Sequence, residues 1–311
     1  MTDPGSTGAT VADDSFHAPA DADPFWTETA WFGFNVPERR IAGAIYPVFR
    51  PNQGICSAGV YVWDHTGVCQ HEILYARNWW HLPMPAHDLV ELSLPIGLRY
   101  DTVEPLTTYR VRFDDPDELQ LDLTFDAVHE PHAPITGATG HLDQVCRVQG
   151  RLRLHGEEIE VDSYDMRDRS WSVRKDTGAV RAGYDYGVAV ADGRAGEVFL
   201  AMSVGGGDEQ PVLAGYHFVD GQVRRVTGGR RTVERDRGRP VAVRVEVTDD
   251  AGVNVTATSD LRNQFAFQSS PNYFAWMSLT DWTVGDAVFR GQSQDVWSPD
   301  LLRAEQRGRQ A

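Results

Sequence analysis

Most of the chain is a succession of short runs in which apolar and polar residues alternate. Alternation with a period of two is typical of β-strands that have one buried face. Asp-Gly dipeptides at 192–193 and 220–221 separate such runs in the way that hairpin turns do. Nine runs of this kind are Gly43–Phe49, Ala58–Trp63, Tyr109–Phe113, Leu119–Phe125, Val145–Leu154, Ile159–Tyr164, Tyr186–Val190, Val198–Val204 and Val241–Val247.

Helical patterning is nearly absent. The best helix candidate runs from Pro299 to about Arg309, with Ser298 as its N-cap. Strands without intervening helices exclude Rossmann, TIM-barrel and α/β-hydrolase folds. The 311 residues have room for roughly 16–20 strands. We therefore expect an all-β protein with two antiparallel β-barrels or sandwiches side by side and very little helix.

Composition along the chain predicts three segments. Residues 1–23 are small, polar and rich in Pro, Gly and Asp, which predicts a disordered N-terminal tail. The segment Glu130–Gly140 is rich in Pro, Gly and Thr and is the best candidate for a domain boundary. We expect an N-terminal β-barrel over residues 24–135 and a C-terminal β-barrel over residues 136–311, ending in the short helix.

The charge balance excludes several classes of protein. The formal net charge is −16, which argues against a nucleic acid or an anionic membrane as partner. No run approaches about 18 consecutive apolar residues, so we expect no membrane span. Lys175 is the single lysine, and its neighbours indicate an exposed position. This excludes Schiff-base, pyridoxal-phosphate and P-loop chemistry, each of which needs a well-placed lysine.

The N-terminus has no basic start and no apolar core, so it does not read as a signal peptide and we expect a cytoplasmic protein. Three cysteines without C-x-x-C spacing form neither a disulfide framework nor a zinc site, and we expect all three to be buried. They are Cys56, Cys69 and Cys146.

Three histidines within 13 residues raise the question of a metal site, and they are His129, His132 and His141. Pro131 prevents a helix from presenting the first two on one face, so we interpret them as part of a polar linker. We expect no metal and no cofactor, since nucleotide-binding loops are absent as well.

Aromatic residues are abundant and often adjacent in sequence. Most must be ordinary core residues, but adjacent aromatics on a strand point to opposite faces, so one of each pair can line a second surface. A large barrel with aromatic walls is a natural pocket for an apolar small molecule. The candidate substrate-binding residues are Trp31, Phe32, Trp80, His81, Tyr186 and Trp276.

The stretch from Tyr164 to Trp171 breaks the period of two and contains Arg167, Asp168 and Arg169. One interpretation makes Asp168 the ion-pair partner of a neighbouring arginine in a bulged strand. The other makes Asp168 a buried acid, with Tyr164 and Trp171 beside the reacting centre and Arg167 binding substrate.

Several elements resemble the carotenoid 1,2-hydratase/AttH-like family of calycin-related proteins. They are His141, Gln144, Gly150, Gly156-Glu157 and Arg167-Asp168-Arg169-Ser170-Trp171, with a family histidine at the position of Arg169. The runs Trp276–Trp282 and Gly291–Trp297 resemble the end of actinobacterial members. The resemblance implies two lipocalin-like barrels with an apolar cavity, and hydration of isolated double bonds or cyclisation of polyenes.

The leading hypothesis is a cofactor-independent hydratase or dehydratase acting on an apolar, terpenoid-like alkene or tertiary alcohol. Asp168 protonates the substrate to a carbocation, because burial in an apolar site keeps a carboxyl group protonated near pH 7. Trp171 and Tyr164 stabilise the cation through their rings, and His141 or Gln144 holds the attacking water. The alternatives are a non-catalytic carrier or sensor of a lipophilic molecule, and an isomerase or cyclase that uses the same cavity.

Overall fold

The computed structural model describes residues 8–135, 137–175, 180–270 and 272–308. Strands make up 67% and helices 7%, so the all-β prediction is confirmed. All nine alternating runs lie inside strands, and the predicted C-terminal helix is α1, Pro299–Gly308. At the turns Asp192-Gly193 and Asp220-Gly221 both residues have a positive φ, between 52° and 74°. Such angles are those of the type I′ turn, whose twist matches that of the paired strands.

The chain divides into two compact units. The first comprises Met1–Val62 and Tyr75–Lys175, and the second comprises Trp63–Leu74 and Asp176–Ala311. The division therefore falls near residue 175 and not near the predicted residue 135. The Pro/Gly-rich segment Glu130–Gly140 is a connection within the first unit, since the strands that follow it pair with the strands that precede it.

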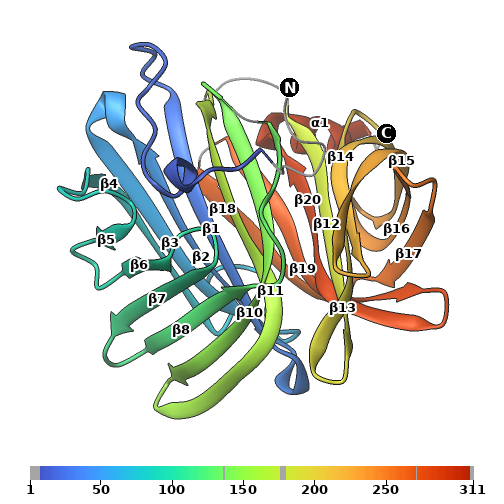
Figure 1. The fold of residues 1–311 in the computed structure, drawn as a ribbon, viewed down its shortest axis with the longest axis horizontal. Coiled ribbons are helices and arrows are strands. Elements are labelled where there is room, and N and C mark those ends of the chain that lie inside the picture. The colour runs from blue at the N-terminus through green and yellow to red at the C-terminus, as the bar shows by residue number, and fades with distance from the viewer. Residues whose placement is uncertain (1–7, 136, 176–179, 271, 309–311) are drawn as a thin grey trace. The chain divides into compact units, whose positions relative to one another are not determined.

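Eleven strands of the described chain form the sheet of the first unit, in the order β4-β3-β2-β1-β11-β10-β8-β7-β6-β5, with β9 paired to β10 (Figure 1). The 3-10 helices η1, η2 and η3 are Val11–Asp14, Pro37–Arg39 and Pro51–Gln53. The strands are β1 (Trp26–Val36), β2 (Ile41–Arg50), β3 (Ile55–Trp63), β4 (Tyr75–Pro83), β5 (Glu91–Ser93), β6 (Arg99–Glu104), β7 (Thr108–Asp115), β8 (Leu119–Ala127), β9 (His132–Ile135), β10 (Gly140–Leu154) and β11 (Glu157–Val173).

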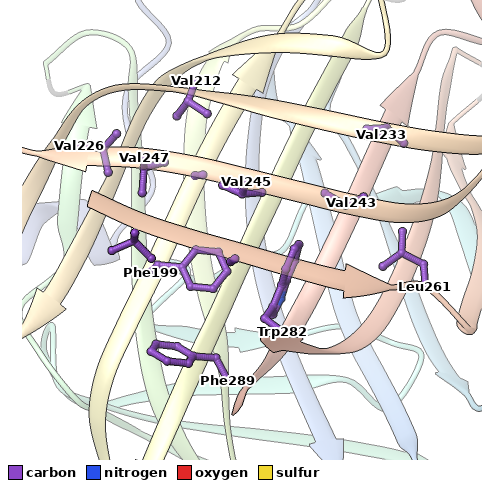
Figure 2. Packing of buried hydrophobic residues seen from close by; sticks show 13 residues of the cluster. Phe199, Val212, Val226, Val233, Val243, Val245, Val247, Leu261, Trp282 and Phe289 are labelled. Carbon is purple, nitrogen blue, oxygen red and sulfur yellow. The ribbon is translucent and has the colours of Figure 1, made fainter. Parts of the chain in front are cut away.

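The second unit contains nine described strands in the order β17-β16-β15-β14-β13-β12-β20-β19-β18. An additional pairing of β17 with β19 closes this sheet on itself, and a core that includes Phe199, Val245, Trp282 and Phe289 fills it (Figure 2). The strands are β12 (Arg181–Ala191), β13 (Arg194–Val204), β14 (Glu209–Val219), β15 (Gln222–Asp236), β16 (Arg239–Asp249), β17 (Asn254–Asp260), β18 (Asn263–Ser270), β19 (Tyr273–Val284) and β20 (Ala287–Trp297).

The structure corrects the prediction for one cysteine and bears on the expected absence of a membrane span. All three cysteines are free, and Cys56 and Cys146 are buried as expected, but Cys69 is exposed because it lies in the loop between β3 and β4. Within the described residues, no helix is both long and apolar enough to cross a membrane.

The composition of residues 1–23 predicts a disordered tail, but residues 8–23 are part of the first unit, and residues 1–7 lie outside the described residues. Asp14 is fully buried: its carboxylate forms an ion pair with Arg167 and accepts hydrogen bonds from the Leu106 N–H (2.7 Å) and the Tyr109 hydroxyl (3.1 Å). A few residues later, the His17 ring stacks on Trp171 with 3.8 Å between centroids. Composition misses this segment because its contacts are polar and distant in sequence.

We predict that Asp14→Ala lowers the free energy of unfolding by roughly 3–5 kcal/mol, because it leaves the buried Arg167 guanidinium without its carboxylate. Urea denaturation measures the change. Asp21→Ala is the matched control, since it removes an exposed carboxylate from the same segment and should cost less than about 0.5 kcal/mol. Equal stability of the two variants would contradict a structural role for the segment.

Candidate active site

Strand β11 presents opposite chemistry on its two faces. Arg167 and Arg169 are fully buried on the face that contacts the interior of the first unit. The Arg167 guanidinium lies 3.9 Å from the ring centroid of Tyr109, and the Arg169 guanidinium is 2.8 Å from a carboxylate oxygen of Glu28. Each arginine therefore has its own buried acid, Asp14 for Arg167 and Glu28 for Arg169.

Asp168 lies between these arginines in sequence, so its side chain points to the other face of the sheet. The strand register places it beside Trp31 of β1 and Asp143 of β10. Asp168 is half-buried, and within the described part of the chain its carboxylate has neither an ion-pair nor a hydrogen-bond partner. The interpretation that it pairs with Arg167 or Arg169 is therefore wrong.

The surroundings of Asp168 favour its protonated form. Burial raises the pKa of this carboxyl from 3.8 to about 6. The neighbouring charge of His141 opposes the increase, whereas that of Asp143 adds to it. A carboxyl group with this pKa is partly protonated close to neutral pH, whereas an ordinary exposed aspartate is fully ionised there.

His141 and Asp143 form a hydrogen-bonded pair on the same face as Asp168. The Nε2 atom of His141 lies 2.9 Å from Oδ1 of Asp143, which is fully buried. Burial alone would lower the pKa of His141, but the Asp143 carboxylate outweighs it and the pKa is raised. An ionised carboxylate only accepts hydrogen bonds, so Nε2 carries the proton that joins the pair.

Aromatic side chains continue this face onto β1 and β2. Trp31 is 5% exposed, and its ring centroid lies 5.3 Å from that of Tyr46 at an interplanar angle of 66°. Gly33 leaves the room that this arrangement needs, since a Cβ atom there would lie 3.3 Å from Nε1 of Trp31 and 2.5 Å from Oδ1 of Asp165. The result is a carboxyl group bordered by indole and phenol rings.

A network of hydrogen bonds connects Tyr46 to the end of β11. Arg174 donates one hydrogen bond to the Tyr46 hydroxyl at 3.4 Å and another to the Ser170 hydroxyl. Ser170 in turn hydrogen-bonds Thr29 of β1 at 2.7 Å. These contacts anchor the guanidinium of Arg174 beside the Tyr46 oxygen, on the same face as Asp168.

The three clustered histidines do not form a metal centre. Burial lowers the pKa of His129 to about 4, so its ring is neutral. Its Nδ1 donates to the Glu130 carbonyl oxygen at 2.7 Å, and its Nε2 accepts from the Val145 N–H at 3.4 Å. The described residues contain no group of three or more His, Cys, Asp and Glu side chains that would hold a metal ion.

A family model described as Domain of unknown function (DUF7064) matches residues 10–288. The chain belongs to this family. The match begins before Asp14, so the N-terminal segment is part of the DUF7064 domain. No curated protein sequence matches the chain.

Solved structures show the same fold as this DUF7064 domain. A Nitrosomonas europaea protein provisionally assigned as AttH is similar with a TM-score of 0.63 at 16% identity, over 94% of this chain and 98% of that one. The protein CghA is similar with a TM-score of 0.59 at 15% identity, over 88% of each chain. Kievitone hydratase from Nectria haematococca is more distant, with a TM-score of 0.47 at 9% identity over 88% of each chain. The resemblance to the AttH-like group is confirmed at the level of the fold.

The structure brings three of the predicted residues together, namely Asp168, His141 and Trp31. Tyr164 is half-buried four residues before Asp168, and its carbonyl oxygen accepts a hydrogen bond from Asn35 at 2.9 Å. Tyr46, Asp143 and Arg174 complete the group and were not predicted. The H-x-D spacing of His141 and Asp143 could have predicted that Asp143 lies beside His141, because residues two apart on a strand share a face.

Other predicted residues lie elsewhere. Gln144 faces the interior, where its amide donates to the carbonyl oxygens of Leu106 and His129, both at 2.8 Å, and accepts from Arg167 at 3.0 Å. Trp171 is 1% exposed and donates to the Gly137 carbonyl oxygen at 3.0 Å. Arg167, Gln144 and Trp171 thus form interior contacts on the face opposite Asp168.

The remaining predicted aromatic contacts are spread over both units. Phe32 is in the core of the first unit, at 1% exposure. Trp80 is 44% exposed and His81 is exposed as well, both on the edge strand β4. Tyr186 and Trp276 belong to the second unit, on β12 and β19, and are buried and half-buried respectively.

We predict that Asp168→Asn stabilises the protein above pH 6. The pKa of Asp168 is higher in the folded than in the unfolded state, so ionisation costs folding free energy as the pH rises from about 4 to about 6. Asparagine avoids this cost, which is about 1 kcal/mol once solvent screening of a partly exposed group is allowed for. Thermal melting should therefore show a gain of a few degrees at pH 8 and none at pH 4.

The comparison between the two pH values serves as the internal control, since only the ionised carboxylate is at issue. A variant that melts well below the parent protein at pH 8 would indicate that Asp168 forms a stabilising ion pair.

Proposed function

We propose that the protein is a cofactor-independent hydratase or dehydratase that acts on an apolar alkene or tertiary alcohol of terpenoid type. The observation that carries the proposal is Asp168, a half-buried carboxyl with a pKa near 6 that is bordered by Trp31 and Tyr46. The names of structural relatives agree with it only as analogy, because the identities are too low to carry an activity.

In the hydration direction, the Asp168 carboxyl transfers its proton to one carbon of the double bond, and the other carbon becomes a carbocation. The Asp168 carboxylate and the face of Trp31 stabilise that cation, the ring by up to about 2 kcal/mol in a desolvated setting. Water adds to the cation, and its surplus proton returns to Asp168. Dehydration follows the same steps in reverse.

His141 and Asp143 have a supporting role in this scheme. The proton held between them places a cationic or strongly polarised imidazole near Asp168, which lowers the energy of the carboxylate left after proton transfer. His141 thereby opposes the burial that raises the pKa of Asp168, whereas Asp143 adds to the increase. A carboxyl near 6 is an effective acid at neutral pH, because part of it is protonated and the proton is not held too tightly.

Turnover tests the acid directly. We predict that Asp168→Asn folds and loses about 10²–10⁴-fold in the conversion of linalool to myrcene or of α-terpineol to limonene, measured by gas chromatography. In D₂O, the parent protein should also exchange deuterium into limonene, because protonation of the alkene is reversible. Asp122→Asn, which removes an exposed carboxylate of the same sheet, is the control and should retain turnover.

The pH dependence of turnover provides a second test, because the proposal fixes the direction in which kcat/KM changes with pH. The active form is protonated Asp168, so kcat/KM should fall as the pH rises through about 6, approaching tenfold per pH unit. An Asp168→Asn variant with parental turnover, or a rate that rises through this range, would contradict the proposal. Tight binding of these terpenoids without any turnover would favour a carrier.

A further inference from the structure

The Asp14 carboxylate occupies a site that is built by other parts of the first unit. Its donors are Arg167 on β11, the Tyr109 hydroxyl on β7 and the Leu106 N–H in the turn before β7. Oδ1 accepts from Arg167 and from Tyr109 at 3.1 Å, and Oδ2 accepts from Leu106 at 2.7 Å. Donors directed at two oxygens, together with one cation, match the chemistry of a carboxylate group.

Gln144 positions these donors without any contribution from Asp14. Its side-chain oxygen accepts from Arg167 at 3.0 Å, and its amide nitrogen donates to the Leu106 carbonyl oxygen at 2.8 Å. The Arg167 guanidinium also lies on the ring of Tyr109, 3.9 Å from its centroid. The donors are therefore held by the sheet and by Gln144, and the site is preorganised for a carboxylate that reaches it.

The N-terminal segment, residues 8–23, is weakly anchored apart from Asp14. Asp14 is its only buried residue, and no residue of the segment belongs to a strand. Segments with little apolar burial and no ladder hydrogen bonds open locally at a low cost in free energy. The other contacts of its central part are polar: Arg169 donates to the Asp14 and Ser15 carbonyl oxygens, Asp88 accepts from the Phe16 N–H, and Glu28 accepts from the His17 N–H.

Two aromatic contacts of the segment show what else a ligand would find there. The Phe16 ring lies 4.8 Å from that of Phe49, and the His17 ring is stacked on Trp171 at 3.8 Å between centroids. Phe49 and Trp171 are at most 1% exposed. A molecule that replaces the segment therefore meets a carboxylate site and, close to it in the chain that it displaces, two apolar aromatic surfaces.

The charge of the site limits which molecule can do this. An unpaired buried Arg167 would be strongly destabilising, so Asp14 leaves only when another anion takes its place, and one negative charge is sufficient. The ligand also competes with a tethered carboxylate whose effective concentration is roughly millimolar, so it needs apolar contacts in addition.

We propose that the interior face of the first unit binds a lipophilic monocarboxylate, which displaces Asp14 and with it the N-terminal segment. Asp14 is then a built-in competitor that keeps the site closed until such a ligand is present. This face is opposite to that of Asp168, so the inference does not depend on the proposed function.

The probe is 4-phenylbutanoate, which joins a carboxylate to a phenyl ring, and 4-phenylbutanamide is the neutral control of the same shape. Isothermal titration calorimetry measures the binding of each. We predict that Asp14→Ala binds the carboxylate at least about tenfold more tightly than the parent protein, because the tethered competitor is gone. Asp21→Ala, which removes an exposed carboxylate from the same segment, should bind as the parent does. Adding Arg167→Gln to Asp14→Ala should abolish the preference for the carboxylate over the amide.

Hydrogen exchange of the parent protein tests the displacement without relying on the stability of a variant. At about 10 mM, above the effective concentration of the tethered carboxylate, 4-phenylbutanoate should accelerate deuterium uptake by residues 8–23, whereas 4-phenylbutanamide should not. The proposal is overturned if the carboxylate leaves this exchange unchanged. It is equally overturned if a folded Asp14→Ala variant binds the carboxylate no more tightly than the parent does, or binds the amide as tightly as the carboxylate.

Discussion

Two buried ion pairs on one strand determine how the first unit is built. Arg167 and Arg169 point into the interior of the first unit, and each needs a carboxylate there. An unpaired buried guanidinium would lower the free energy of unfolding too far for the fold to be stable. Asp14 satisfies the first from the N-terminal segment, and Glu28 satisfies the second from β1. The pairs therefore tie the N-terminal segment, β1 and β11 together and fix the register in which Asp168 faces the other way.

The second unit shows what an adjacent cation does to a buried carboxylate. Asp295 is 1% exposed and lies 3.0 Å from Arg231 and 2.7 Å from Arg235. Burial raises its pKa, but the two guanidinium groups outweigh burial and hold it at about 2. Asp168 lacks such a pair, and burial dominates instead, with a pKa of about 6.

The sequence predicted the strands well because alternation and turn residues are local signals. It also contained the rule that decides the role of Asp168, since neighbours on a strand cannot share a face, so Asp168 cannot pair with Arg167 or Arg169 from within the same regular strand. What local patterns do not contain is which distant segment supplies the missing acid. Asp14 lies 153 residues from Arg167, in a segment whose composition resembles a tail.

The same limit explains the site. His141 and Asp168 were predicted from the family resemblance and from the break in alternation at Tyr164–Trp171. Tyr46 gives no such signal, and it becomes their neighbour only through the pairing of β1 with both β2 and β11. Gln144 and Trp171 were assigned to the site because the facing of β10 and β11 was not known from sequence. Their contacts instead support the interior network on which the position of Asp168 depends.

The central claim is that burial raises the pKa of the Asp168 carboxyl to about 6. Carbon-13 NMR of aspartate carboxyl groups, with Asp168→Asn used to assign the resonance, measures this directly. The account predicts that the Asp168 carboxyl titrates near pH 6 in the folded protein. Titration near pH 4 or below would show that this carboxylate is solvated or ion-paired, and would contradict its proposed role as the acid.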